Sequence, residues 1–175
     1  MKMNQTFRLA SIIVCIFILG GCAAPIVTPR LLLEEDIRPY SNINFSTKCF
    51  LAENLSKEMA RLEEKVNKRL MKIDNISGVR LNAPCQNTDE NLMCITATIT
   101  DIKKVSETAI FFFGIFAGTS HINVEVTITH AKSGRTLGSY EVVGNHGGTN
   151  TSIDLAAKGI ANIIKDHLKK LDKQS

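Results

Sequence analysis

The sequence has little net charge of either sign. Its 175 residues include 21 lysines and arginines against 17 aspartates and glutamates, a formal charge of +4. Lys2 and Arg8 precede an apolar run, and without them 19 basic residues minus 17 acidic residues leave only +2. A nucleic-acid-binding protein needs a basic stripe that displaces counterions from phosphates. The charge balance therefore predicts no nucleic-acid partner.

Motifs that carry catalytic chemistry are also lacking. The sequence has no G-x-S-x-G elbow, no phosphate-binding P-loop and no dinucleotide fingerprint. None of the four histidines, His121, His130, His146 and His167, has an H-x-x-x-H partner, and no C-x-x-C pair is present. We expect no enzyme activity, no metal and no cofactor other than a covalent lipid.

A long stretch of some 20 apolar residues is lacking, and the longest apolar run lies at the amino terminus. With 22% charged residues the chain is neither intrinsically disordered nor a polytopic membrane protein. The run from Leu9 to Leu19 is about 11 residues long, shorter than the roughly 20 that a spanning helix needs. Because basic residues precede it and two glycines follow, it is typical of a secretory signal.

The end of this signal resembles a bacterial lipobox. Leu19, Gly20, Gly21 and Cys22 follow its order of a branched apolar residue, two small residues and a cysteine. The resemblance implies cleavage between Gly21 and Cys22, a diacylglyceryl group on the thiol and acylation of the new amine. Such a lipid holds a protein stably on a membrane. The alternative is an ordinary cysteine after an uncleaved anchor or a conventional signal.

The residue after the cysteine bears on location. Ala23 stands where aspartate would favour the inner membrane under the sorting rule of enteric bacteria, so this resemblance implies the periplasmic face of the outer membrane. We therefore divide the chain into a signal peptide at 1–21, a proline-containing tether at 22–35 and one periplasmic domain at 36–175.

Hydrophobic periodicity predicts the fold class. Strands are expected near 37–46, irregular or at an edge because of Pro39, and at 95–100, 122–129 and 136–143, with a short strand at 79–83. A phase slip at Asp101 predicts a bulge. Apolar spacings of three and four predict helices over 51–73 and from about 151 to the end. The main order β-α-β-β-β-α predicts an α+β fold, a mainly antiparallel sheet with two helices packed on one face.

Three cysteines remain after Cys15 and Cys22 are set aside. An oxidising periplasm predicts one disulfide and one free thiol among them. Cys85 and Cys94 bracket a polar loop between two predicted strands, so their pairing is the simplest arrangement. A bridge from Cys49 to either one, and no bridge at all, are the alternatives.

One connection between strands is apolar where a polar loop is expected. Residues 109–118 include a candidate contact loop formed by Phe111, Phe112, Phe113, Ile115 and Phe116. Such a segment is buried in the fold, pressed against a partner or second copy, or inserted into lipid. Its glycines break any helix or strand period, which favours a flexible apolar finger.

A glycine-rich segment precedes the last helix. Residues 145–150 would bind an anion through backbone amides if those amides were free. A plain strand-to-helix turn is the more common structure for such a segment, and we favour it.

The segment from 99 to 168 resembles a group of small bacterial lipoproteins with a domain of unassigned function. The resemblance rests on the strand at 122–126, the turn at 130–135, in which His130 replaces the usual acid, and the alanine-containing last helix. In element order this domain is similar to the amino-terminal domain of the TolB translocation protein and to the periplasmic part of the curli secretion lipoprotein. The resemblance implies a role in assembly or transport through contact.

We therefore expect a membrane-anchored lipoprotein of the bacterial envelope that acts as a non-enzymatic accessory or scaffold subunit. Its partner would be an envelope protein or further copies of the same chain. The alternative is a periplasmic binding module for a small envelope ligand, a glycan or lipid fragment, with residues 145–149 and the apolar loop forming its mouth.

Overall fold

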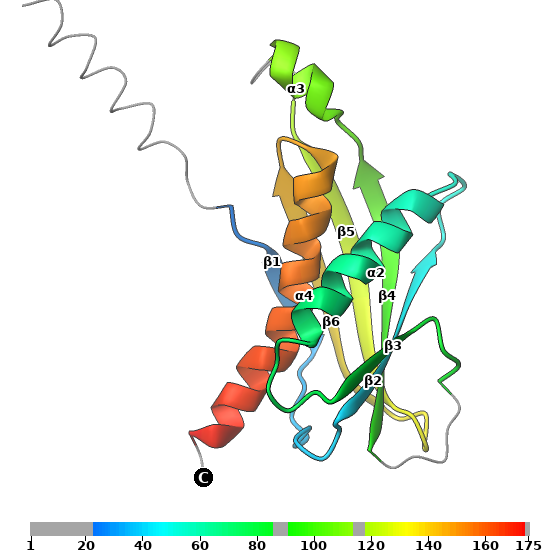
Figure 1. Cartoon of the computed structure of the whole chain (residues 1–175), viewed down its shortest axis with the longest axis vertical. Helices are drawn as coiled ribbons and strands as arrows, with labels where there is room; N and C mark the ends of the chain where they lie inside the picture. The colour runs from blue at the N-terminus through cyan, green and yellow to red at the C-terminus, as the bar shows by residue number, and fades with distance from the viewer. Residues whose placement is uncertain (1–22, 86–90, 114–117, 174–175) are drawn as a thin grey trace, which may run out of the picture.

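A computed structural model describes residues 23–85, 91–113 and 118–173. Figure 1 shows a sheet, two helices that lie against it and a short helix beyond one end. The strands are β1 (Ile26–Leu31), β2 (Asn42–Cys49), β3 (Gly78–Leu81), β4 (Leu92–Lys103), β5 (Ser120–His130) and β6 (Thr136–His146). The helices are α2 (Ser56–Leu70), α3 (Glu107–Phe113) and α4 (Thr149–Asp172).

The predicted α+β fold is confirmed, and the sheet is mixed. Its strand order is β1-β6-β5-β4-β2-β3. The β1–β6, β6–β5 and β5–β4 pairs are antiparallel, whereas β2 runs parallel to both β4 and β3. Parallel neighbours need a crossover, and α2 supplies it between β2 and β3. The bulge predicted at Asp101 is present as a register shift between Ile99 and Asp101.

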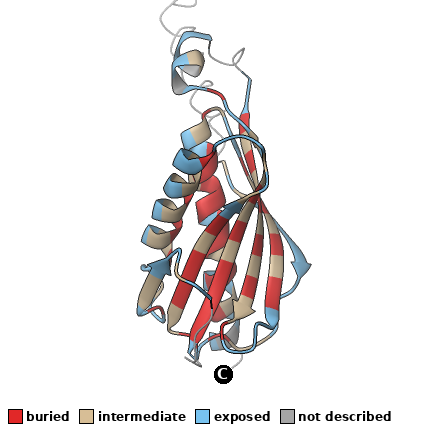
Figure 2. Cartoon of the chain, turned by 90° about the vertical axis from the view of Figure 1, so that its right-hand side faces the viewer, coloured by how far each residue is buried: buried red, intermediate tan, exposed pale blue. Residues whose placement is uncertain are grey.

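Helices α2 and α4 cover one face of the sheet. Because strand side chains alternate between faces, every second residue of β4, β5 and β6 enters the core under these helices, as the bands in Figure 2 show. The predicted apolar face of β5 is buried as expected, through Ile122, Val124, Val126 and Ile128. The helices add Leu62, Val66, Leu70, Ile153, Ala157, Ile160 and Ile164.

Two glycines allow α4 to lie close to the sheet. A Cβ atom at Gly144 of β6 would stand 2.0 Å from the carbonyl oxygen of Ser152. A Cβ atom at Gly159 of α4 would stand 2.5 Å from Cγ1 of Val142. Larger residues at either position would push the helix away from the sheet.

The segment expected to be a tether contains a strand. β1 extends the sheet at the outer edge of β6, and Leu33 after it is buried in the core. An edge strand tolerates Pro29, one of the two prolines of the expected tether. The division at residue 36 was therefore wrong, because the folded domain includes the residues from Ile26 onward.

The first predicted strand is shifted and lies elsewhere in the sheet. Residues 37–46 were expected to form an irregular or edge strand, but Arg38 and Pro39 form a turn and β2 begins at Asn42. β2 lies between β4 and β3, with Ile43 and Phe45 fully buried. Pro39 ends the preceding segment and is outside the strand that it was expected to interrupt.

Candidate functional site

Several elements meet at one end of the sheet. β4 ends there at Lys103, opposite His121 near the start of β5, and Ser120 pairs with His146 at the end of β6. We call this end of the sheet, marked by Lys103, Ser120 and His146, the α3 end, because α3 stands beyond it in Figure 1. β1 begins at the same end, with Ile26 opposite Val143.

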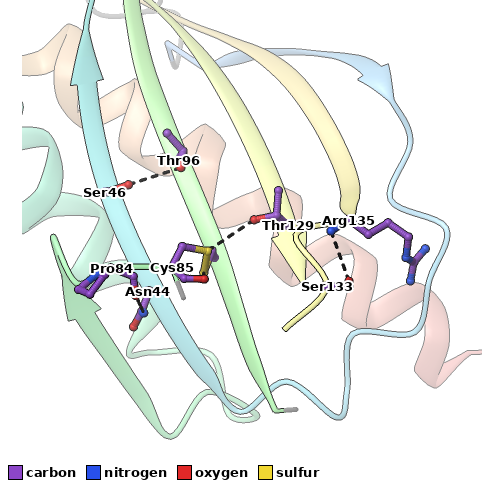
Figure 3. Close-up of a disulfide and its surroundings, with 9 residues drawn as sticks. Asn44, Ser46, Pro84, Cys85, Thr96, Thr129, Ser133 and Arg135 are labelled. Carbon is purple, nitrogen blue, oxygen red and sulfur yellow. Dashed lines mark hydrogen bonds between the residues drawn. A yellow bond between two sulfur atoms is a disulfide. The ribbon is translucent and has the colours of Figure 1, made fainter. Parts of the chain in front are cut away.

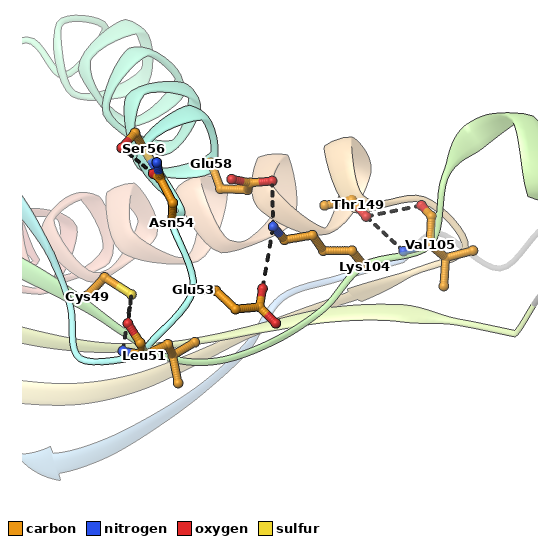
Figure 4. A network of polar contacts seen from close by, with 9 residues as sticks. All are labelled: Cys49, Leu51, Glu53, Asn54, Ser56, Glu58, Lys104, Val105 and Thr149. Carbon is orange, nitrogen blue, oxygen red and sulfur yellow. Dashed lines mark hydrogen bonds and ion pairs between the residues drawn. The ribbon is translucent and has the colours of Figure 1, made fainter.

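Hydrogen bonds fix both stems of the α3 connection to the start of α4. The hydroxyl of Thr149 donates to the carbonyl oxygen of Val105 and accepts from the Val105 amide, both at 3.0 Å (Figure 4). The Thr149 hydroxyl also lies 3.4 Å from that of Ser120. Ser152, fully buried, donates to the Ser120 carbonyl at 3.0 Å. The segment before α3 and the strand after it are therefore held by one helix terminus.

An ion-pair network adds a third attachment. Nζ of Lys104 lies 3.2 Å from a Glu58 carboxylate oxygen and 3.7 Å from one of Glu53, so it joins the stem of α3 to the start of α2 (Figure 4). Exposed ion pairs contribute little stability singly. Here the pairs add a contact between the segment before α3 and the start of α2.

The phenylalanines of α3 face solvent. Phe111, Phe112 and Phe113 are 84%, 72% and 65% exposed. The rings of Phe111 and Phe112 contact each other edge to face, with centroids 5.4 Å apart. Burial within the fold, one of the three expected outcomes, is therefore wrong for these residues, and the expected finger is helical over Glu107–Phe113. Ile115 and Phe116 lie outside the described residues.

The sheet face opposite the helices is polar and half-exposed. Its central strands present Thr96, Thr98 and Thr100 from β4 beside Glu125 and Thr127 from β5. At its edge the guanidinium of Arg30 lies 2.7 Å from a Glu125 carboxylate oxygen and 3.3 Å from one of Glu141. We call this surface the open sheet face. An antiparallel sheet commonly leaves one such face to water, so it is available for contact without unfolding.

A disulfide joins Cys85 and Cys94, the pairing that the loop position favoured. It lies on the open sheet face away from the α3 end, and the Cys85 sulfur is 3.7 Å from the Thr129 hydroxyl (Figure 3). The nearby Asn44 amide donates to the Pro84 carbonyl at 3.0 Å. The bridge thus holds the residues after β3 over this part of the sheet. Cys49 has a free thiol.

The glycine-rich turn is used for structure. An anion site over residues 145–150 needs free backbone amides, but the Thr149 amide and hydroxyl both contact Val105. The amide of Ser152 donates to the carbonyl of Gly148, the residue directly before α4. The favoured description as a strand-to-helix turn agrees with these contacts, and α4 begins at Thr149, two residues before the expected start.

A cavity of about 480 Å³ lies between β1 and α4. Its walls include Leu33, Tyr140, Ile163 and His167. The Tyr140 hydroxyl accepts a hydrogen bond from the Leu33 amide at 2.8 Å, and burial raises the pKa of Tyr140. His167 donates from Nε2 to the Glu35 carbonyl at 2.8 Å. The sequence did not indicate this cavity, because the residues of β1 were expected to form a tether.

A second charged contact holds the segment after β1. The Glu35 carboxylate accepts hydrogen bonds from the Arg135 guanidinium and, at 2.9 Å, from the Tyr40 hydroxyl. The Arg135 bond is the main cause that lowers the pKa of Glu35, and the Tyr40 bond acts in the same direction. The segment that crosses the lower end of the domain is thereby fixed to the β5–β6 hairpin.

Within the described residues, no helix combines the length and apolar character needed to cross a bilayer. The same residues contain no group of three His, Cys, Asp or Glu side chains placed to hold a metal ion. Gly21 and Cys22 precede the described residues.

The fold and surfaces define a class: an α+β domain with two helices on one face of a mixed sheet and a polar face left open. The chain belongs to the family described as "Domain of unknown function (DUF4410)", which matches residues 35–147. This agrees with the expected domain of unassigned function. No curated protein matches the chain in sequence.

Solved structures share the fold. The PelC dodecamer from Paraburkholderia phytofirmans has a TM-score of 0.56 at 12% identity, over 79% of this chain and 96% of that chain. Protein XCC0632 from Xanthomonas campestris, assigned to DUF330, has a TM-score of 0.50 at 11% identity, over 87% and 98%. At such low identities the similarity concerns the fold alone.

Proposed function

We propose that this chain is a lipoprotein of the bacterial outer membrane that acts as a non-enzymatic accessory or scaffold subunit. The observation that carries the proposal is the sequence of the amino-terminal signal, in which basic residues, an apolar run, Gly20, Gly21 and Cys22 follow one another. Acyl chains on Cys22 would tie the chain to the periplasmic face of the membrane. The domain would then act by contact, as its exposed aromatic helix and open sheet face suggest.

Further copies of the chain or an envelope protein would be the partner. The open sheet face offers aligned hydroxyls and the Arg30 ion pairs to such a partner without any rearrangement of the core. PelC from Paraburkholderia phytofirmans, which has a similar fold, forms a dodecamer in two solved structures, and this supports self-association as one form of the contact.

Two measurements test the proposal. Cys22→Ser should abolish incorporation of labelled palmitate, and undiminished labelling would refute the lipoprotein assignment. A photo-crosslinking residue at Thr98, on the open sheet face, should give discrete high-mass adducts in intact cells. The same residue at Lys57, exposed on the outer side of α2, is the matched control. A scaffold contact through the sheet would be refuted if neither position gave adducts, or if both positions gave the same yield of adducts.

The cavity between β1 and α4 supports a second candidate, a binding module for a small envelope ligand. Its volume of about 480 Å³ falls within the usual range for small-molecule sites. The expected mouth at residues 145–149 is not where this cavity lies. A glycan or lipid fragment that survives purification of the native chain, and is lost when Ile163 is changed to Arg, would favour this function.

A further inference from the structure

The exposed phenylalanines and the point where the chain enters the fold lie at the same end of the molecule. Antiparallel pairing puts Ile26 opposite Val143, three residues before the end of β6. The end of β6 is opposite Ser120, the first residue of β5 after the α3 connection. Figure 1 shows the start of β1 and α3 toward the same end of the long axis.

The connection from Cys22 to the sheet is short. Only Ala23, Ala24 and Pro25 separate Cys22 from Ile26. Four extended residues span at most about 14 Å. A tether over the expected range 22–35 would have reached several times farther. An acyl group on Cys22 therefore holds the α3 end close to the lipid surface and the β5–β6 hairpin away from it.

This end also gathers the exposed aromatic side chains of the described residues. Phe111, Phe112 and Phe113 extend beyond the sheet on α3, and Phe50, 82% exposed, follows directly after β2. Ile26 is 59% exposed at the start of β1. Glu53, in the same connection as Phe50, contacts Lys104, which places that connection near the stem of α3.

The described stems on either side of α3 are attached to the domain. Thr149, Ser152 and Lys104 join them to the starts of α2 and α4. A short helix with adjacent, exposed aromatic residues, at the end of the domain nearest an acylated cysteine, suits the boundary between headgroups and acyl chains. Burial of apolar side chains there removes them from water.

We propose that α3 is a second membrane contact, in which Phe111, Phe112 and Phe113 enter the lipid surface beside the acyl chains of Cys22. This inference rests on the proposed lipidation of Cys22. The two contacts together fix the orientation of the domain, so the open sheet face stands roughly upright from the membrane and faces partners within the periplasm.

The test uses the full mature chain, purified from membranes and reconstituted in vesicles of phosphatidylethanolamine and phosphatidylglycerol that contain a doxyl-labelled phospholipid. Cys49→Ser removes the free thiol. Thr108→Cys on α3 then takes an environment-sensitive fluorophore while all three phenylalanines are kept. Thr136→Cys, exposed at the opposite end of the sheet, is the matched control.

We expect the doxyl lipid to quench the label at position 108 and to leave the label at position 136 unquenched. Changing the three phenylalanines to serine should abolish the quenching at 108, and an unchanged melting temperature would show that the fold is intact. Equal quenching at both positions, or quenching that survives the serine changes, would overturn the inference. The inference would also be overturned if the label at position 108 became shielded from water only as the protein concentration rises, because that result indicates contact with a second copy of the chain.

The failure of the proposed function has a different signature. The mass of the purified chain reports whether Cys22 is acylated before any vesicle is made. A chain without acyl groups overturns the lipoprotein assignment and the orientation that depends on it. An acylated chain without quenching at position 108 overturns the α3 contact alone.

Discussion

The hydroxyl group of Thr149 makes two of the hydrogen bonds that attach the α3 connection to α4. In Thr149→Val the shape is kept, but the bonds to the amide and carbonyl of Val105, both 3.0 Å long, are lost. A neutral hydrogen bond contributes a net 0.5–1.5 kcal/mol, so the two together are worth about 1–3 kcal/mol. Val105 is itself buried, which leaves its amide without water to replace the lost partner.

Urea unfolding followed by circular dichroism measures the change in global stability, and hydrogen exchange measures the local effect. A loss of 1–3 kcal/mol corresponds to roughly 5- to 150-fold faster exchange at the Val105 amide. Thr151→Val, an exposed position on the same helix, controls for the change in helix propensity. If the two variants unfold alike and the Val105 amide exchanges at the same rate in both, Thr149 does not fix the α3 connection.

Three further predictions concern stability. Leu33→Ala should lower the free energy of unfolding by about 2–5 kcal/mol, as for other large-to-small core changes, whereas Leu32→Ala, at an exposed position, should have little effect. Glu35→Gln should destabilise the chain at pH 7, and the deficit should shrink as the pH falls below about 4, where glutamate is normally protonated. Replacing Cys85 and Cys94 by alanine should cost up to about 3 kcal/mol in urea unfolding, because the bridge closes a loop of about ten residues.

Each of these predictions has a result that contradicts it. Equal effects of Leu33→Ala and Leu32→Ala would mean that the segment after β1 is not part of the core. The sign for Glu35 follows from its lowered pKa: the stabilisation exists above the unfolded pKa and is lost as pH falls through the folded one. A Glu35→Gln deficit that grows on acidification would exclude the Arg135 contact. Unchanged stability without the disulfide would show that the loop is constrained by other contacts.

Strong period-two patterns made the centre of the sheet predictable. Ile122, Val124, Val126 and Ile128 alternate with polar residues, and all four are buried as expected. The fold class followed from such strands and from two helices with one apolar stripe each. The order of residues along one element predicts the fold class, because burial of one face requires an apolar residue at every second position of a strand and at every third or fourth position of a helix.

The edges of the fold lacked such a pattern. β1 contains Pro29 and Arg30, and its Arg30 side chain lies over the open sheet face, where it contacts Glu125 and Glu141 from two other strands. Those carboxylates are about a hundred residues away in the sequence, so no local signal indicates the pairing. Pro39 likewise suggested an irregular strand, because nothing local distinguishes a proline within a strand from one in the turn before it.

For the candidate site, the sequence indicated which residues to consider but not their exposure or their neighbours in the fold. The phenylalanines of 111–113 were singled out because they are apolar in a connection between strands, but their exposure depends on where the stems are attached. Thr149 is a common residue at the start of a helix, and its contact with Val105 joins positions 44 residues apart. The closeness of Ile26 to the α3 end follows from the register of β1 against β6. No strand was predicted over these residues, so no register was predicted either.

The mass of the amino-terminal peptide from the membrane-purified chain tests the central claim most directly. The account predicts a peptide that begins at Cys22 and carries a diacylglyceryl group and an amide-linked acyl chain. A peptide that retains residues before Cys22, or that begins at Cys22 without lipid, would contradict the anchor on which both the proposed function and the orientation of the domain depend.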